Sequence, residues 1–504
     1  MTAEAGSGVR TRLEGSTYLK PLPWKHAVEI LPPRSVAKLH DNTLAILENV
    51  GVKMGSKIWL ERMADAGAKV DFAAERVWFP PELVEEKIKL APASFDLGAR
   101  DPALDLHIGS GNVYLSTDGC VPDVLDLASG ERRKGTKHDL SEITRLADAL
   151  PQISFHWQPV SATDTPDYVR PLHEIEAQLS STSKHIQQMT VVDPWNARGM
   201  VEMLEVVAGS KEALRARPLM SNFQCCISPL SWEGEPLEAI DVLAQAGIPV
   251  GICSMPIACA TAPATMAGLM SVMNAEILSG ITALQIAYPG HPTWYIPYAT
   301  SMDLNTGALN LGWGPEELTS EMAGAQIGRH YGIPTITGVF GSGAKTANWQ
   351  AGVQNGMSAF GKVFSPADMV TAAGTLVFCN AYSMDELVLD AEIWDIAWTF
   401  AKGFDFDEET LAFDAIAEVG PANHFLGTQH TRDHMLDFWR SGIFDRDSWE
   451  DWEAKGKPDP VDNARRKVRE ILDTHEPLQL EDDQLKELSR IVNAYQVERA
   501  EEDD

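Results

Sequence analysis

The central part of the chain alternates between short apolar runs and longer segments whose apolar residues recur every three to four positions. Leu237, Ile240 and Leu243 mark one such helical segment. Successive runs lie roughly 30–45 residues apart, a spacing typical of βα units. We predict strands over Ile153–Val160, His185–Val191, Pro218–Ile227, Pro249–Met255, Ala283–Ala287, Trp294–Thr300, Thr335–Phe340 and Thr375–Asn380.

This succession of strand–helix units favours a TIM (β/α)8 barrel of the α/β class. A doubly wound open sheet is the rival fold, but no GxGxxG opens any helical segment, so the usual cofactor signature of that fold is missing. We expect a flexible tail at 1–20, an N-terminal helical and β extension at 21–135, the barrel at 136–403 and a C-terminal helical extension at 404–504.

Two local patterns belong to the extensions. A β-ribbon is predicted over Val113–Leu127, with a turn at 129–131 around Gly130. Arg465, Val468 and Leu472 share one helical face and predict a helix near the C-terminus.

The net charge of −31 and the pI near 4.7 limit the possible partners. Such a field repels a phosphate backbone and an anionic membrane surface, so we expect neither nucleic acid nor membrane binding. Six cysteines occur without a CxxC pair, and the first twenty residues hold no apolar core of signal-peptide length. We therefore expect a soluble, cytoplasmic protein whose negative field would help to gather a cationic substrate.

Aromatic residues crowd the predicted carboxyl ends of the strands, where a TIM barrel builds its active site. The faces of such rings attract a quaternary ammonium, which cannot donate a hydrogen bond, by about 0.5–2 kcal/mol each. The alternative is that the rings fill the core or cover the barrel mouth. The aromatic residues of this rim are Trp157, Tyr288, Trp294, Tyr295, Tyr298, Phe340 and Trp349.

Other candidate chemistry is weaker. Glu276 is a carboxylate within an apolar helical segment, where a buried charge indicates either a structural ion pair or a functional role. Lys184 and Lys345 lie near strand ends and offer a Schiff base, as in barrel aldolases. His430 and His434 share a helix face, but the Glu of an HExxH site is absent, so we predict no metal site.

An ordered set of motifs resembles the trimethylamine methyltransferase family. The segment Met255–Ala258, followed by Ala262–Gly268 and Asn274–Glu276, is similar to the MPLAG…GPVTLAG…NAE stretch of that family. Further matches run in order from about Asp118 to Asp445. They include Gly130–Arg133, Met302–Asp303, Gly314–Glu316, His330–Pro334, Gln350–Gly352, Leu389–Asp390 with Glu392, and His424–Leu426 with His430.

The resemblance implies a TIM barrel that transfers a methyl group from an amine to the cobalt of a corrinoid protein. Archaeal trimethylamine members carry pyrrolysine before the Gln-Ala-Gly motif, whereas Val339–Lys345 here holds ordinary residues only. Pyrrolysine-free members act on quaternary amines such as glycine betaine. Because the chain has no DxHxxG corrinoid signature, the resemblance implies that a partner protein carries the corrinoid and that this chain binds no cofactor tightly.

We therefore predict methyl transfer from a small, glycine-betaine-like quaternary ammonium to a corrinoid protein. Lys345 is the candidate for a substrate carboxylate. The predicted catalytic residues are Glu276 and Gln350, and the predicted substrate-binding residues are Trp157, Gln224, Tyr288, Trp294, Tyr295, Phe340, Lys345, Trp349 and Gln354.

Three alternatives stay open at this point. The methyl group could pass directly to tetrahydrofolate, the chain could be a non-catalytic quaternary-amine-binding protein, or Lys345 could act as the Schiff base of a barrel aldolase. Because family members associate with themselves, we also expect a homo-oligomer.

Overall fold

Eight parallel strands form a barrel in the computed structural model, which describes residues 17–25, 27–312, 314–338 and 340–503. The first sixteen residues of the expected tail, and Val339 in the expected seventh strand, lie outside this described part. The barrel strands are β7 (Asn112–Thr117), β10 (Ile153–Trp157), β11 (His185–Gln188), β12 (Met220–Cys225), β14 (Val250–Ser254), β16 (Tyr295–Pro297), β18 (Ile336–Gly338) and β19 (Met369–Ala373).

The sheet closes on itself through two contacts. Its path runs from β16 through β14, β12, β11, β10, β7 and β19 to β18. A parallel bridge joins Tyr295 of β16 to Thr335 at the start of β18, and the Tyr295 N–H donates to the Pro334 carbonyl at 2.9 Å. Closure brings the carboxyl ends of all eight strands to one end of the barrel, which we call the mouth.

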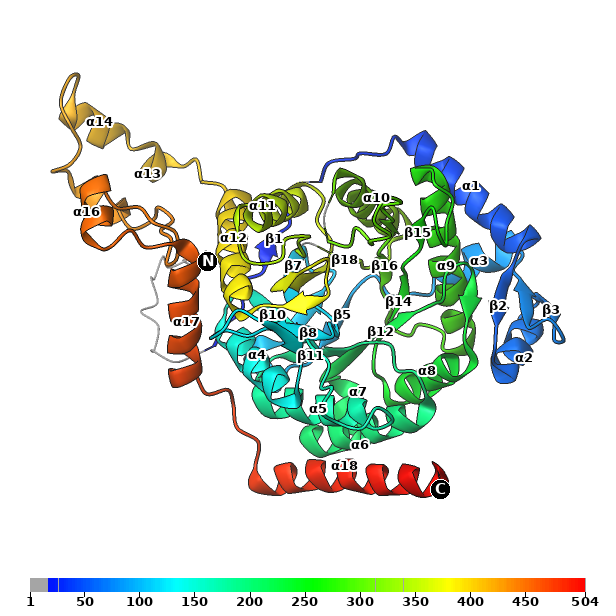
Figure 1. Ribbon diagram of the computed structural model, residues 1–504. Helices are drawn as coiled ribbons and strands as arrows, with labels where there is room; N and C mark the ends of the chain where they lie inside the picture. The colour runs from blue at the N-terminus through cyan, green and yellow to red at the C-terminus, as the bar shows by residue number, and fades with distance from the viewer. Residues whose placement is uncertain (1–16, 26, 313, 339, 504) are drawn as a thin grey trace, which may run out of the picture.

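A helix follows each strand and packs outside it, which completes the TIM barrel predicted from the sequence (Figure 1). A short helix, α7 (Lys211–Ala216), precedes β12. The barrel helices are α4 (Lys137–Ala149), α5 (Arg170–Ser181), α6 (Pro194–Ala208), α8 (Gly234–Ala246), α9 (Met266–Ala287), α10 (Pro315–Tyr331), α11 (Trp349–Phe364) and α12 (Met384–Lys402).

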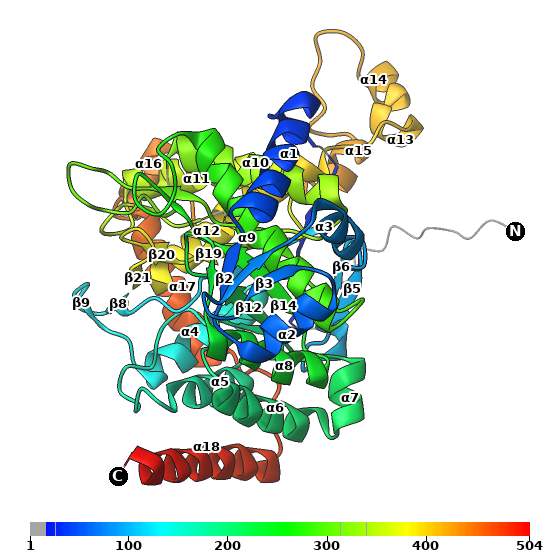
Figure 2. The same ribbon diagram turned by 90° about the vertical axis from the view of Figure 1, so that its right-hand side faces the viewer.

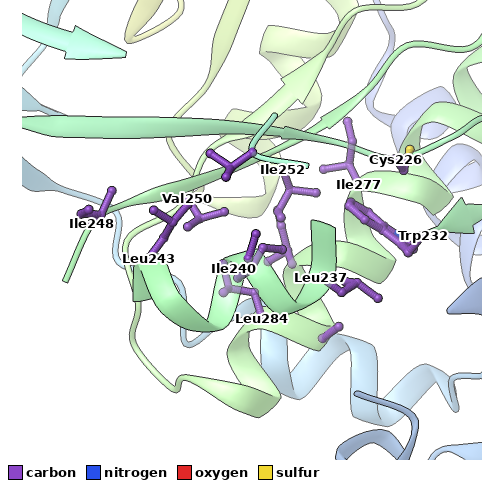
Figure 3. Close-up of a cluster of buried hydrophobic side chains, with 14 of the residues drawn as sticks. Cys226, Trp232, Leu237, Ile240, Leu243, Ile248, Val250, Ile252, Ile277 and Leu284 are labelled. Carbon is purple, nitrogen blue, oxygen red and sulfur yellow. The ribbon is translucent and has the colours of Figure 1, made fainter. Parts of the chain in front are cut away.

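The packing of α8 and α9 on β14 shows how apolar spacing builds the wall (Figure 3). Leu237, Ile240 and Leu243 form one face of α8 and are at most 2% exposed. They meet Val250 and Ile252 of β14. Burying such side chains stabilises the fold by about 1.5–3 kcal/mol each.

Helix α9 accounts for one error in the strand prediction. Ala283–Ala287, predicted as a strand, is the last part of α9. Sixteen of the 22 residues of α9 are buried, so the helix is apolar on all sides and gives no amphipathic signal. Among the described helices only α9 has the length and composition to cross a membrane, but 83% of its most apolar window is buried inside the protein.

The first and last barrel strands also differ from the prediction. Thr375–Asn380 is not the last strand, because β19 ends at Ala373 and a turn follows. The expected ribbon Val113–Leu127 contains β7, which pairs in parallel with β10 and β19, so one barrel strand lies before residue 136. The other six predicted strands overlap barrel strands and are confirmed.

Short strands surround the mouth. The predicted turn around Gly130 is confirmed, since it joins β8 to β9 in an antiparallel pair. The mouth strands are β8 (Asp123–Leu125), β9 (Arg132–Lys134), β13 (Ser231–Trp232), β15 (Ile257–Ala258), β17 (Thr300–Ser301), β20 (Thr375–Leu376) and β21 (Ala381–Tyr382).

The N-terminal region covers the outer side of α9, on the right of Figure 1. Its hairpin β5–β6 supplies Leu97 and Leu106 to the barrel interior. The elements of this region are β1 (Leu22–Pro23), α1 (Pro33–Asn49), β2 (Val52–Met54), α2 (Lys57–Asp65), β3 (Lys69–Asp71), β4 (Arg76–Trp78), α3 (Pro81–Ile88), β5 (Phe95–Leu97), η1 (Pro102–Leu104) and β6 (Leu106–Ile108).

The C-terminal region contains an arm and two long helices. The arm, residues 404–457, extends outward after α12 (Figures 1 and 2) and returns to that helix at Ser441, whose hydroxyl donates to Glu392. It holds α13 (Glu408–Leu411), α14 (Phe413–Val419), α15 (Gln429–His434) and α16 (Trp449–Ala454). The predicted C-terminal helix is confirmed as α17 (Pro460–Thr474), which packs on α12, and α18 (Asp482–Asp503) packs on α6.

We predict that Gly280→Ala destabilises the protein. A Cβ at Gly280 would lie 2.5 Å from Cζ2 of Trp232 and 2.6 Å from Cγ2 of Ile252. The overpacking cost of about 1–3 kcal/mol then exceeds the gain of about 1 kcal/mol in helix propensity. Urea denaturation measures the difference. Gly356→Ala in α11, where a Cβ meets nothing within 4 Å, is the matched control and should raise stability; equal gains in both variants would contradict the packing argument.

Candidate active site

A cavity of about 130 Å³ opens at the mouth, and each barrel strand contributes to it. We call it the mouth cavity. Its described lining residues are Asp118, Gly119, Trp157, Met189, Phe223, Met255, Tyr298, Leu311, Gly312, Glu317, Glu321, Gly338, Phe340, Ala372 and Cys379. The strands, the segments that follow them and α10 therefore place rings, sulfur atoms and carboxylates around one small space.

Four aromatic side chains form one part of this lining. The ring centroids of Trp157 and Phe223 lie 4.5 Å apart, and Tyr298 meets Phe223 edge-on at 5.5 Å. Phe340 follows β18 and packs edge-on against Trp394 at 6.2 Å. The face of an aromatic ring attracts a cation, so these rings suit a cavity that binds a small cation.

Gly119 allows the Trp157 ring to reach the cavity. A Cβ at residue 119 would overlap atoms of the indole six-membered ring. The φ angle of Gly119 is not in the left-handed region, so space and not backbone conformation requires glycine here. The indole Nε1 has no hydrogen-bond partner among the described residues, so apolar contacts hold the ring.

Asp118 is one of three acidic residues that line the mouth cavity. It follows β7 directly and is 8% exposed. Burial raises the pKa of Asp118 to about 6, although hydrogen bonds from the Gly119 N–H, Thr375 and Cys379 oppose this shift. Its Oδ2 atom has no hydrogen-bond partner within the described part of the chain. An ionised Asp118 therefore gains from a cation in the cavity.

Glu321 of α10 reaches the cavity across β18. Burial raises the pKa of Glu321, while its ion pair with the buried Lys362 of α11, at 2.9 Å, opposes this shift. Lys362 also donates to the Thr337 hydroxyl at 3.0 Å. A Cβ at Gly338 would overlap the Glu321 carboxylate, so only glycine lets the acid lie against this strand.

A strained turn forms the wall beside Asp118. Val377, Phe378 and Cys379 have φ angles of 57°, 55° and 56°, so three consecutive non-glycine residues are left-handed. Ala372 of β19 has a φ of 85°. Each such residue costs about 1–3 kcal/mol, and residues of this kind concentrate at functional sites.

A second cavity of about 220 Å³ adjoins the first between α10 and α11. We call it the side cavity. It shares Gly312, Glu317, Glu321 and Phe340 with the mouth cavity. Its remaining described lining residues are Gly314, Pro315, Leu318, Val353, Gln354, Met357 and Ser358.

Three of the predicted site residues lie in these cavities. Trp157 and Phe340 line the mouth cavity, and Gln354 lines the side cavity. The Gln354 Oε1 accepts from the Ser342 hydroxyl at 2.6 Å and the Gly343 N–H at 3.1 Å, so it also holds the loop after β18.

Glu276 and Gln224 are buried outside both cavities. Glu276 accepts hydrogen bonds from the hydroxyls of Ser228 and Ser254, the Leu230 N–H and the Cys226 thiol, at 2.5–3.3 Å. These bonds anchor the loop after β12 to α9. Gln224 donates to backbone carbonyls behind the strands.

Three predicted aromatic residues lie away from the cavities for identifiable reasons. Trp294 precedes β16, where it packs against Phe95 at 4.8 Å. The Tyr295 side chain points out of the barrel, and its hydroxyl donates to the Asn274 side chain at 2.9 Å. Tyr288 caps the end of α9 and donates to Asp241 at 2.7 Å; it entered the prediction only because Ala283–Ala287 reads as a strand.

The remaining predicted residues are exposed and do not line either cavity. Lys345 donates to the Gly343 carbonyl at 2.6 Å, and its ammonium lies 4.6 Å from the centroid of the Phe378 ring. Trp349, at the start of α11, is 85% exposed, and Gln350 follows it. Lys184, the other Schiff-base candidate, differs from these residues: it is buried, lies outside both cavities and donates to two backbone carbonyls.

Sequence reasoning missed Phe223, Asp118, Glu317 and Glu321. Phe223 lies inside a correctly predicted strand, so inward alternation could have indicated it. Asp118 could have been predicted only if β7, which it follows, had been recognised as the first barrel strand. Glu317 and Glu321 lie on a helix, and no local signal connects them to the mouth. Among the described residues no three His, Cys, Asp or Glu side chains are grouped to hold a metal ion.

A closed barrel with a ring-and-carboxylate cavity at its mouth is the architecture of a TIM-barrel enzyme. A sequence model described as "Trimethylamine methyltransferase (MTTB)" matches residues 9–500. The chain therefore belongs to the trimethylamine methyltransferase family, and it is a methyltransferase.

Curated relatives agree with this assignment. The chain is 32% identical to the glycine betaine methyltransferase of Desulfitobacterium hafniense strain Y51 over 451 residues, covering 89% of this chain and 93% of the relative. It is 31% identical to a trimethylamine methyltransferase MttB of another strain of that species, over 87% and 88% of the two chains. The crystal structure of Methanosarcina barkeri monomethylamine methyltransferase matches with a TM-score of 0.48 and 10% identity, over 90% of this chain and 89% of that one.

We predict that Glu276→Gln lowers the free energy of unfolding by about 1–3 kcal/mol. The substitution places an amide NH2 among donors that need acceptors, and buried groups left unsatisfied cost about that much. Urea denaturation measures the loss. Glu61→Gln on the surface of α2 is the control, because its ion pair with Lys57 is exposed and contributes little. Equal stability of the two variants would argue against an anchoring role for Glu276.

We predict that the affinity for a small cation increases as the pH rises through about 6. The pKa of Asp118 is raised to about 6, so the carboxylate is neutral below this pH and negative above it. Titration calorimetry with tetramethylammonium between pH 5 and 8 measures the effect. Asp118→Asn should remove most of the dependence, whereas an unchanged profile in that variant would assign it to another group, Glu321 first.

Proposed function

We propose that this methyltransferase takes a methyl group from a small quaternary ammonium compound, of the size of glycine betaine, and passes it to the cobalt of a corrinoid protein. The observation that carries the proposal is the mouth cavity, where Trp157, Phe223, Tyr298 and Phe340 surround a space that also holds the Asp118 carboxylate. Rings and a carboxylate together bind an onium cation that offers no hydrogen-bond donor.

Methyl transfer from a quaternary ammonium requires no acid or base from the protein. When the carbon–nitrogen bond breaks, its electron pair stays on nitrogen, so a neutral tertiary amine leaves and needs no proton. Reduced cobalt supplies the electron pair that captures the methyl group. The residues of the mouth cavity hold the cation, orient one methyl group towards the opening and exclude water.

The names of the relatives support this proposal. One is a glycine betaine methyltransferase, and others are trimethylamine methyltransferases. The corrinoid acceptor, its location on a partner protein and a cytoplasmic setting, consistent with six free cysteines, belong to the same proposal.

Self-association is also part of the proposal, and the arm supports it. Large apolar side chains on the arm are exposed to a degree that is uncommon for a monomer surface. They include Phe404 (81%), Phe406 (76%), Phe413 (74%), Leu426 (81%) and Phe438 (76%).

The experiment mixes the purified chain with a reduced corrinoid protein and onium compounds and follows the methyl–cobalt absorption. We expect methylation with at least one quaternary ammonium and none with trimethylamine, because this chain has no pyrrolysine. Phe223→Leu should weaken onium binding by about 2- to 30-fold, which corresponds to about 0.5–2 kcal/mol.

The matched control is Phe360→Leu, an exposed ring of α11 outside the cavities, which should leave onium binding unchanged. Methyl transfer to tetrahydrofolate without any corrinoid would replace the acceptor in the proposal. Failure of every onium compound to bind would overturn the proposal itself.

A further inference from the structure

The two cavities contain negative charge and no positive charge of their own. Asp118, Glu317 and Glu321 line the mouth cavity, and the two glutamates also line the side cavity. None of the described residues that line either cavity is Lys, Arg or His. Glu321 has a counter-ion behind the wall, since Lys362 contacts it at 2.9 Å, but Asp118 keeps one buried oxygen without a partner among the described residues.

Four basic side chains in the loops of the mouth contact partners outside the two cavities. Arg132 and Lys134 of β9 both contact Asp123. Arg133 contacts Asp139 at 2.6 Å, and Lys345 is held by the Gly343 carbonyl and the Phe378 ring. None of these cations therefore provides a ready partner for a carboxylate within the cavities.

The space next to the cation site is suited to an uncharged group. The side cavity adds about 220 Å³ to the mouth cavity, and Pro315, Leu318, Val353 and Met357 give it an apolar surface. Burying a carboxylate against such a surface carries a desolvation cost, and the Asp118 carboxylate in the adjoining mouth cavity adds like-charge repulsion. An alkyl, hydroxyalkyl or amide substituent incurs neither.

Resting on the proposed function, we infer that the methyl donor is a quaternary ammonium cation whose fourth substituent is uncharged, and that Asp118 selects it against zwitterionic betaines. The observations that carry this inference are the unpartnered oxygen of Asp118 among the rings, and the lack of a cation on the described walls. The donor then has a net charge of +1, which also suits a protein with a net charge of −31.

Three probes test the inference on the full chain: choline and a nearly isosteric pair. Glycine betaine and its carboxamide have almost the same shape but differ in net charge by one unit. We expect calorimetry at pH 7.5, where Asp118 is ionised, to show that the amide and choline bind at least tenfold more tightly than glycine betaine. Equal or tighter binding of glycine betaine would overturn the inference while leaving onium binding intact. If none of the three binds, the proposed function fails instead.

Two variants locate the selectivity. Asp118→Asn should reduce the preference for the amide over glycine betaine, because it removes the charge that attracts one and repels the carboxylate of the other. The far-ultraviolet spectrum and melting temperature check that this variant is folded. Lys345→Met should leave the ratio unchanged; a loss of glycine betaine affinity alone would reveal a carboxylate subsite at Lys345 and overturn the inference.

Discussion

Closure of the barrel between Tyr295 and Thr335 is the constraint on which the rest of the structure depends. An open sheet would leave the end of β16 far from the end of β18. With the ring of strands complete, Tyr298 after β16 and Gly338 of β18 line the same cavity as Phe223. Residues distant in sequence thus meet because the strands are parallel and their carboxyl ends lie at one end of the barrel.

The mouth cavity combines groups that are costly to bury separately. A carboxylate loses hydration when rings surround it, and the raised pKa of Asp118 records that cost. The same loss of water strengthens its attraction to an entering cation. The wall is strained as well, since Val377, Phe378 and Cys379 adopt left-handed backbone angles next to the acid. The fold therefore gives up stability at the mouth and depends on the packed wall, such as α8 and α9 on β14, to offset it.

The sequence indicated most of the barrel because period-two and period-3.6 patterns survive where one face of an element is buried. These patterns do not identify α9, because it is buried on all sides. Its last part was therefore predicted as a strand, and Tyr288 at the end of that segment was placed in the predicted site. Trp157 and Phe340 could be predicted because both lie at the carboxyl ends of strands that the sequence pattern indicates. Glu321 could not, since its approach depends on the missing Cβ of Gly338, a contact between elements that local spacing does not encode. Lys345 and Trp349 were expected at the site from their places in the chain, whereas the structure leaves both exposed.

The close fit between residue 119 and the Trp157 ring has an evolutionary consequence. Because a Cβ there would occupy the volume of the indole, the two positions cannot vary independently. A descendant that replaces Gly119 must first accept a smaller side chain at 157, and would lose a wall of the cavity before gaining anything from the change. Changes in the substrate that relatives of this chain accept should therefore arise at other lining positions such as Met255, while the Gly119–Trp157 pair is inherited as a unit.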